Sequence, residues 1–134
     1  MDREATETAL ARTRVIVIED ETELRNGLQY LLNMSPGYEC VKSLRSMEDA
    51  LRLIDSLRPA LVLTDLGLPM MNGIEGTRII QEKFPDLPIV VLTVHEEDDQ
   101  IFRALCAGAR GYLLKKTPPK RIIEALDEVI AGGA

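Results

Sequence analysis

Four short stretches of this 134-residue chain carry side chains that could do chemistry. They are the acidic run Glu19-Asp20-Glu21, the carboxyl group of Asp65, the hydroxyl of Thr93 and the amine of Lys115. Each stands where an apolar run typical of a buried strand gives way to polar residues. Because strand ends on one edge of a parallel sheet converge in space, we expect these groups to form one site. Carboxylates with a hydroxyl and a lysine indicate phosphoryl chemistry around a divalent cation.

Each of these residues also has a purely structural interpretation. Asp20 or Glu21 could simply favour a helix N-terminus, and Asp65 could be a turn residue. Thr93 could be an ordinary strand residue and Lys115 a solvated one. Taken together, however, carboxylates at the ends of adjacent strands would repel one another and raise at least one pKa. A hard cation such as magnesium, which takes one or two carboxylates, a carbonyl and waters, would relieve that repulsion.

Strand and helix patterns alternate along the chain and would position these groups. Near-continuous apolar runs at 15–18, 61–64 and 89–92 are typical of strands buried on both faces of a parallel sheet. Weaker runs at 38–44 and 111–114 are typical of edge strands. Amphipathic segments between these runs predict helices that cover the sheet. The pattern predicts an α/β fold of five strand-helix units with right-handed crossovers.

Local residues predict where several helices begin and end. Ser46 with Asp49 three residues later predicts an N-cap and a first turn, and so does Thr117 followed by Pro118. Proline and glycine predict the helix ends, at Pro36-Gly37, Pro59, Pro85 and Gly108.

Length and composition predict a single domain and exclude several classes of protein. A hydrophobic content of 46% is enough for one sizeable core. No apolar run is long enough for a membrane span and the first residues lack a signal-peptide plan, so we expect a soluble cytoplasmic protein without membrane contact. The formal net charge of -6 disfavours direct binding of nucleic acid by this chain. Any contact with DNA would require another domain.

The cysteines and the domain limits complete this first outline. Cys40 and Cys106 show no metal-ligand spacing, so we interpret them as reduced structural thiols. The polar start predicts a flexible N-terminal tail at 1–13, followed by the domain at 14–131. Residues 132–134 would begin a C-terminal linker or tail.

The chemical residues lie in motifs that resemble the receiver domain of two-component response regulators. The motifs read Val-Ile-Glu19-Asp20-Glu21, Leu-Thr-Asp65-Leu-Gly-Leu-Pro69-Met-Met-Asn-Gly73, Val-Leu-Thr93 and Ala-Gly-Ala-Arg-Gly-Tyr112-Leu-Leu-Lys115-Lys116. The last two are most similar to receivers that precede a helix-turn-helix DNA-binding domain of the NarL and FixJ type, which have a LuxR-type output. The resemblance covers about residues 14 to 131 and implies a flavodoxin-like, CheY-like fold. Such a fold has a five-stranded parallel sheet in the order 2-1-3-4-5, flanked by five helices.

The resemblance implies that the acidic residues accept a phosphoryl group in the presence of Mg²⁺. Asp65 would be the phosphoacceptor and would attack the phosphohistidine of a partner sensor histidine kinase. Asp20, Asp65 and the carbonyl of Gly67 would bind Mg²⁺ directly, and Glu19 would act through water. Lys115 would neutralise phosphoryl oxygens. Glu19 stands where the family more often has Asp.

The resemblance also implies how phosphorylation would be transmitted. The Thr93 hydroxyl would move to bind a phosphoryl oxygen, and the ring of Tyr112 would follow as an aromatic switch that reshapes the surface. The phosphorylated domain would form a homodimer and control transcription through a DNA-binding domain outside this chain. His95 is a candidate modulator of the phosphoryl lifetime, against the interpretation that it is a solvated loop residue. Lys116 replaces a proline that many family members carry after a cis peptide bond.

Two other function classes remain open. The first is a small metal-dependent phosphatase or another flavodoxin-like enzyme, although Gly67 stands where aspartate-nucleophile phosphatases would need an acid/base aspartate. The second is a receiver-shaped interaction module that is never phosphorylated, a class that normally loses one of the acidic residues. On the receiver interpretation the chain is not an enzyme for other substrates and catalyses only its own phosphoryl transfer and dephosphorylation.

Overall fold

The computed structural model describes residues 12–94 and 98–132 of the chain. Residues 1–11 of the predicted tail, residues 133–134 of the predicted linker and the candidate modulator His95 lie outside the described residues. None of the described helices is long and apolar enough to cross a membrane.

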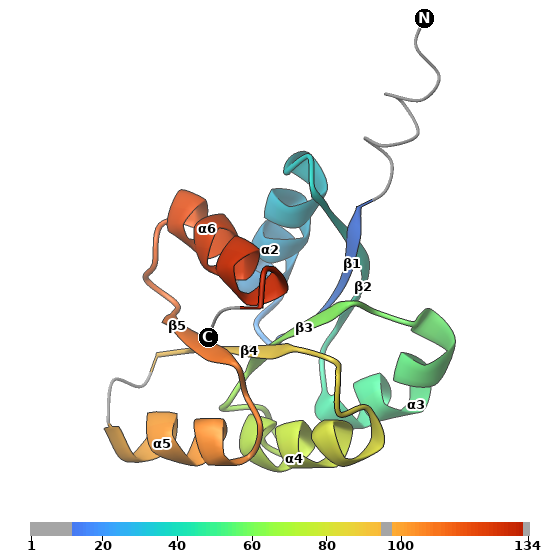
Figure 1. The fold of residues 1–134 in the computed structure, drawn as a ribbon, viewed down its shortest axis with the longest axis vertical. Coiled ribbons are helices and arrows are strands. Elements are labelled where there is room, and N and C mark those ends of the chain that lie inside the picture. Colours follow the sequence, from blue (N-terminus) through green and yellow to red (C-terminus); the bar gives the residue numbers. More distant parts are fainter. Residues whose placement is uncertain (1–11, 95–97, 133–134) are drawn as a thin grey trace, which may run out of the picture.

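A five-stranded parallel sheet forms the centre of the molecule (Figure 1). Its strands are β1 (Thr13–Ile18), β2 (Tyr38–Leu44), β3 (Leu61–Asp65), β4 (Ile89–Thr93) and β5 (Gly111–Leu114). Their order is β2-β1-β3-β4-β5, as predicted. The three strands with near-continuous apolar sequence occupy the centre of the sheet, where both faces are covered, and the two weaker runs form its edges.

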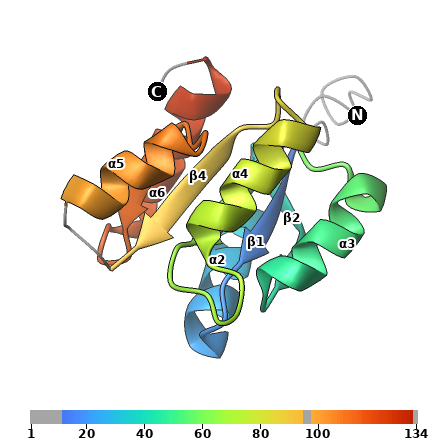
Figure 2. The same cartoon turned by 90° about the horizontal axis from the view of Figure 1, so that it is seen from below.

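Five helices cover the two faces of the sheet in the part of the chain that the structure describes. They are α2 (Thr22–Met34), α3 (Met47–Leu57), α4 (Gly73–Lys83), α5 (Asp98–Cys106) and α6 (Pro119–Ile130). α2 and α6 lie on one face, and α3, α4 and α5 lie on the other (Figures 1 and 2). Alternate residues of β1 therefore enter different cores: Val15 and Val17 pack with α2 and α6, whereas Ile16 and Ile18 pack with α3 and α4.

One predicted helix start is confirmed and one is wrong. The Ser46 hydroxyl accepts a hydrogen bond from the Asp49 amide at 3.1 Å, so Ser46 caps α3 as predicted. Thr117 does not cap α6: it lies in a turn in which its N–H donates to the carbonyl of Leu114 at 2.9 Å, and the cap position is Pro118, one residue later than predicted. Pro119 occupies the first turn, where a missing N–H costs nothing.

The strands run one residue further than predicted at two chemically important positions. Asp65 is the last residue of β3 and Thr93 is the last residue of β4. In the ladder Ile18 pairs with Thr64, and Asp65 pairs with Leu92. The residues that end or follow these strands therefore meet at the same edge of the sheet.

Two glycines let α4 approach its neighbours closely. A Cβ at Gly73 would lie 2.2 Å from the backbone carbonyl oxygen of Asp65, and a Cβ at Gly76 would lie 2.3 Å from the side chain of Met47. The Gly73 N–H also donates to the carbonyl of Leu66 at 2.9 Å. The start of α4 is thus packed directly against the backbone at the end of β3.

We predict that Gly73→Ala lowers the free energy of unfolding by about 1–3 kcal/mol, since the new methyl group meets backbone that cannot move aside. Urea denaturation measures this change.

Gly27→Ala is the matched control, because Gly27 is exposed in the middle of α2 and a Cβ there meets nothing within 4 Å. Alanine favours a helix over glycine by about 0.5–1 kcal/mol, so this variant should gain stability. A Gly73→Ala protein as stable as Gly27→Ala would contradict the close packing of α4.

Candidate acidic phosphoryl site

Glu19 is a buried carboxylate held in place by the backbone around it. Its side chain is 1% exposed, and its N–H donates to the carbonyl of Leu44 at 2.9 Å. Its Oε2 accepts a hydrogen bond from the Glu21 amide at 3.0 Å, at the start of α2. The carboxylate therefore satisfies one of the free N–H groups of the helix N-terminus. This fixes Glu19 at the carboxyl edge of the sheet.

Lys115 joins the ends of β1 and β3 electrostatically. Its Nζ lies 3.1 Å from Oε1 of Glu19 and 3.3 Å from Oδ2 of Asp65, and its side chain is 17% exposed. Asp65 itself is 6% exposed. The Lys115 N–H donates to the carbonyl of Thr93 at 2.8 Å, which fixes the lysine at the end of β4 as well. One ammonium group therefore faces two buried carboxylates.

The pKa values of this cluster show what the burial costs. Burial raises the pKa of Glu19 above 4.5, and the nearby charge of Asp65 adds to the shift. The sequence predicted a raised pKa from repulsion, whereas the larger cause is desolvation. As the pH rises through 4.5 and the higher folded-state pKa, ionisation of Glu19 therefore lowers the free energy of unfolding.

For Lys115 the ion pairs outweigh burial and favour the charged form. Burial acts to lower the pKa of Lys115, but the hydrogen bond to Glu19 and the charges of Asp65 and Glu19 outweigh it and raise the pKa above 10.5. The stability that its positive charge provides is therefore fully present below pH 10.5 and is lost as the pH rises through the folded-state pKa. Lys115 stays charged at neutral pH.

Three carboxylates at this edge have the composition of a cation site. One oxygen from each of Glu19, Asp20 and Asp65 lies within 4.8 Å of the others. Ligands on opposite sides of a magnesium ion, each at about 2.1 Å, are about 4.2 Å apart, so small shifts would bring these oxygens to a common ion. Asp20 is exposed, so its carboxylate can be reached from solvent. The donor set therefore fits a hard divalent cation.

The other predicted residues surround this cluster at different distances from it. A Cβ at Gly67 would lie 3.8 Å from Oδ2 of Asp65, so Gly67 is directly beside the carboxylate. Thr93 is fully buried at the end of β4. Tyr112 lies on β5 with 43% of its surface exposed. The Lys115-Lys116 peptide bond is trans, since the described residues include no cis peptide.

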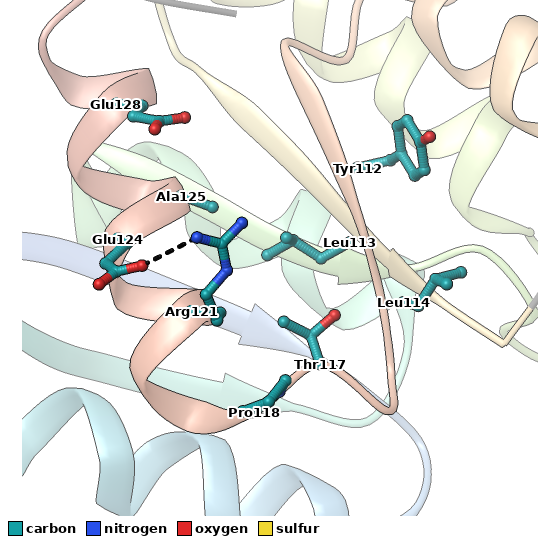
Figure 3. Close-up of a pocket in the computed structure, with 9 residues that line it drawn as sticks. All are labelled: Tyr112, Leu113, Leu114, Thr117, Pro118, Arg121, Glu124, Ala125 and Glu128. Carbon is teal, nitrogen blue, oxygen red and sulfur yellow. Dashed lines mark hydrogen bonds and ion pairs between the residues drawn. The ribbon is translucent and has the colours of Figure 1, made fainter.

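A groove of about 430 Å³ lies between β5 and α6 (Figure 3). Leu114 and Thr117, which flank Lys115 and Lys116, are among its lining residues. Leu113 points from β5 toward α6, whereas the ring of Tyr112 points the other way (Figure 3). The segment that carries the lysine of the site therefore also forms an outer surface of the molecule.

Sequence reasoning missed Arg25, which holds the acidic loop from α2. Its Nη1 donates to the carbonyl of Glu19 at 3.0 Å and to the carbonyl of Asp20 at 3.4 Å. An arginine in the first turns of an amphipathic helix gives no sign that its partners are backbone carbonyls. The contact depends on how the loop folds back over α2.

Comparison with known proteins places the chain in a family. The model of the response regulator receiver domain matches residues 15–127. The chain is 33% identical over 123 residues to the transcriptional regulatory protein DegU of Brevibacillus brevis, a match that covers 92% of this chain and 52% of DegU. It is 36% identical over 118 residues to the nitrate/nitrite response regulator protein NarL of Escherichia coli strain K12, covering 88% of this chain and 55% of NarL. The chain thus spans about half the length of the curated relatives it matches.

A solved structure gives the same result. A two-component response regulator of the LuxR family from Aurantimonas sp. SI85-9A1 superposes with a TM-score of 0.87 at 31% identity, covering 91% of this chain and 87% of that chain. The chain therefore belongs to the response regulator receiver domains, the phosphorylation-activated signalling switches of two-component systems. The predicted likeness to the NarL-type group is confirmed by these relatives.

We predict that Lys115→Met lowers the free energy of unfolding by about 2–4 kcal/mol in buffer without divalent cations, because two buried carboxylates lose their counter-charge. Chemical denaturation in the presence of a chelator measures the loss. Lys120→Met removes the same charge from an exposed position in the first turn of α6 and should change stability by no more than about 0.5 kcal/mol. Equal effects of the two substitutions would contradict the role of the ion pairs.

Proposed function

We propose that Asp65 is the phosphoacceptor of this receiver domain. The observation that carries the proposal is the position of Lys115 Nζ, 3.3 Å from the Asp65 carboxylate and 3.1 Å from Glu19, where the ends of three strands meet. A carboxylate at the mouth of a charged, largely buried cluster can attack phosphorus. The ammonium group beside it can then bind the oxygens of the transferred group.

The transfer we propose is a displacement at phosphorus. A carboxylate oxygen of Asp65 forms a bond to the phosphorus of a phosphohistidine on a sensor histidine kinase, while the phosphorus–nitrogen bond breaks and the leaving imidazole takes up a proton. Lys115 neutralises charge on the phosphoryl oxygens, and the buried Thr93 at the end of β4 supplies a hydroxyl donor to them. The later hydrolysis of the acyl phosphate belongs to the same proposal.

We further propose that the cation of this site is Mg²⁺, held by Asp20, Asp65 and the carbonyl of Gly67, with Glu19 acting through water. The carboxylate oxygens within 4.8 Å of one another support this choice, as does the preference of Mg²⁺ for few carboxylates and retained waters. When bound, the ion supplies positive charge toward the phosphoryl oxygens.

The position of Gly67 favours a receiver over a phosphatase. A Cβ at this residue would lie 3.8 Å from Oδ2 of Asp65, so a longer side chain there would lie over the nucleophile and could act on the leaving group or on water. Glycine offers no such group. The proposed nucleophile and cation site thus lack the acid/base residue that a phosphatase of this type would need at this position.

We propose that the signal leaves through β5, with Tyr112 as the switch and a second copy of the domain as the partner. The Lys115 N–H donates to the Thr93 carbonyl and so links the end of β4 to the residues that directly follow β5. Exposed apolar side chains of Phe102, Leu105 and Tyr112 provide a surface for pairing. A change in phosphorylation at Asp65 would then change this surface.

The wider setting is also a proposal. The chain would be the receiver part, at residues 14–131, of a cytoplasmic transcription regulator whose DNA-binding domain is not among these residues. The matched regions make up 52% of DegU and 55% of NarL, and the names of these two relatives support control of transcription or response regulation. Cys40 and Cys106 are free thiols, as in a reducing compartment. The modulator role of His95 stays a prediction outside the described residues.

The direct test of the proposal is Asp65→Asn. Wild-type protein incubated with acetyl phosphate and Mg²⁺ should gain the mass of one phosphoryl group, and the variant should gain none, because the amide keeps the shape and lacks the nucleophile. Intact-protein mass spectrometry measures the product. A variant phosphorylated to the wild-type level would show that another residue is the acceptor.

The magnesium assignment is tested by thermal unfolding. Mg²⁺ binds the folded site and not the unfolded chain, so at a concentration of 100 times the dissociation constant it should stabilise the wild type by about 2.7 kcal/mol. Asp20→Ala should lose most of this gain. Equal melting shifts in wild type and variant would contradict the assigned ligand.

A further inference from the structure

The loop between β3 and α4 carries the proposed carbonyl ligand and is fixed at its first half by apolar side chains. Leu66 is 5% exposed and packs beside α4 and α5, whereas Leu68, also 5% exposed, packs with α3 and the central strands. Gly67 lies between these two anchors and is exposed. Its position beside the Asp65 carboxylate therefore depends on how the whole loop is held.

The second half of the same loop has an unfavourable backbone conformation. Met70 has a φ of 62°, in the left-handed region, and its side chain is 89% exposed. A residue with a Cβ pays about 1–2 kcal/mol for this region, and an exposed methionine gains no burial in return. Something after Met70 must hold the loop in this turn.

Glu48 makes a contact at the required place. Its Oε2 accepts a hydrogen bond from the backbone N–H of Met71 at 3.0 Å, across 23 residues of sequence. Glu48 lies in the first turn of α3, next to Met47, which is fully buried. Met47 packs against Gly76 of α4, where a Cβ would lie 2.3 Å from the methionine side chain. The Glu48 carboxylate therefore lies where α3 and α4 pack closely against each other.

We propose that Glu48 is a positioning residue for the phosphoryl site, and that its hydrogen bond to Met71 holds the loop so that the Gly67 carbonyl faces the cation. This inference rests on the magnesium site of the proposed function. It assigns to Glu48 no contact with the ion or with the phosphoryl group. The carboxylate acts through the backbone, as partners behind metal ligands commonly do.

The role requires an acceptor oxygen and does not require a negative charge. The second carboxylate oxygen, Oε1, is shielded from solvent and accepts no hydrogen bond from the described residues. In Glu48→Gln the amide oxygen can accept the hydrogen bond from the Met71 N–H. The amide nitrogen can then take the place of Oε1, because no described N–H or O–H group donates to that position. Glu48→Ala removes the acceptor altogether and leaves the Met71 N–H without its partner.

Asp49 offers a matched control on the next position of the same helix turn. Its carboxylate forms an ion pair with Arg52 on the surface, and 42% of the Asp49 side chain is exposed. Asp49→Ala removes the same charge from the same end of α3 without touching the loop. The comparison of Glu48→Ala, Glu48→Gln and Asp49→Ala therefore separates the hydrogen bond from the charge.

Two measurements test the proposal on the full chain. The first is hydrogen exchange at the Met71 amide in the absence of divalent cation, which reports the hydrogen bond itself. The second is Mg²⁺ titration by calorimetry, followed by the rate of phosphorylation by acetyl phosphate at increasing Mg²⁺. In Glu48→Ala we expect faster exchange at the Met71 amide. We also expect about tenfold weaker Mg²⁺ binding, which is the lower end of the range of about 10- to 100-fold for residues behind metal ligands. At saturating Mg²⁺ the phosphorylation rate should return to near the wild-type value.

Glu48→Gln and Asp49→Ala should keep both wild-type Met71 exchange and wild-type Mg²⁺ affinity. Wild-type Mg²⁺ affinity in Glu48→Ala would overturn the proposal, and so would an equal loss in Glu48→Gln and Glu48→Ala. If instead the wild type binds no Mg²⁺, the proposed metal site fails. Met71 exchange still shows in that case whether Glu48 holds the loop.

Discussion

The acidic cluster at the carboxyl edge of the sheet places an electrostatic constraint on the rest of the molecule. Parallel strands that end in register bring Glu19 and Asp65 together in a largely buried place, where desolvation raises the pKa of Glu19. Lys115 offsets this cost through ion pairs to both carboxylates. A cluster balanced in this way is sensitive to any added charge, whether a cation or a phosphoryl group, and that sensitivity is the physical basis of a phosphorylation switch.

The two sides of the site differ in how closely the backbone is packed and hydrogen-bonded. On the β3 side, Gly73 brings α4 against the Asp65 carbonyl, and Glu48 fixes the following loop from α3. On this side, close packing and a hydrogen bond therefore hold the Asp65 backbone and the loop that follows it. On the β5 side, Lys115 is tied to the Thr93 carbonyl and continues into a segment that borders an open groove. On this second side the segment that carries Lys115 therefore connects the buried cluster to the surface.

Membership of the receiver family accounts for the switch, and we propose that the output is carried by residues outside this chain. DegU and NarL match this chain over about half of their own length, so the matched region is the receiver alone. The acidic composition agrees with this division of work, because a net charge of -6 gives the domain no attraction for a phosphate backbone. Phe102 and Tyr112 are among the large apolar side chains that stay exposed in the part of the chain that the structure describes.

The apolar runs of the sequence predicted five parallel strands and the edge at which their polar ends converge, because strands buried on both faces leave continuous apolar runs. The resemblance to receiver domains added the strand order, which the structure confirms, and the roles of Asp65, Asp20 and Lys115, which stay predictions. The sequence placed the start of α6 one residue too early, because Thr117 belongs to the turn with Leu114 and Pro118 takes the cap position. It also did not predict the contacts of Arg25 and Glu48. Both side chains bind backbone groups, which every residue type has, so no sequence motif marks such partners. Only tertiary packing decided those contacts. The same packing made burial, and not repulsion, the larger cause of the raised pKa of Glu19, because desolvation depends on every element that closes over a side chain.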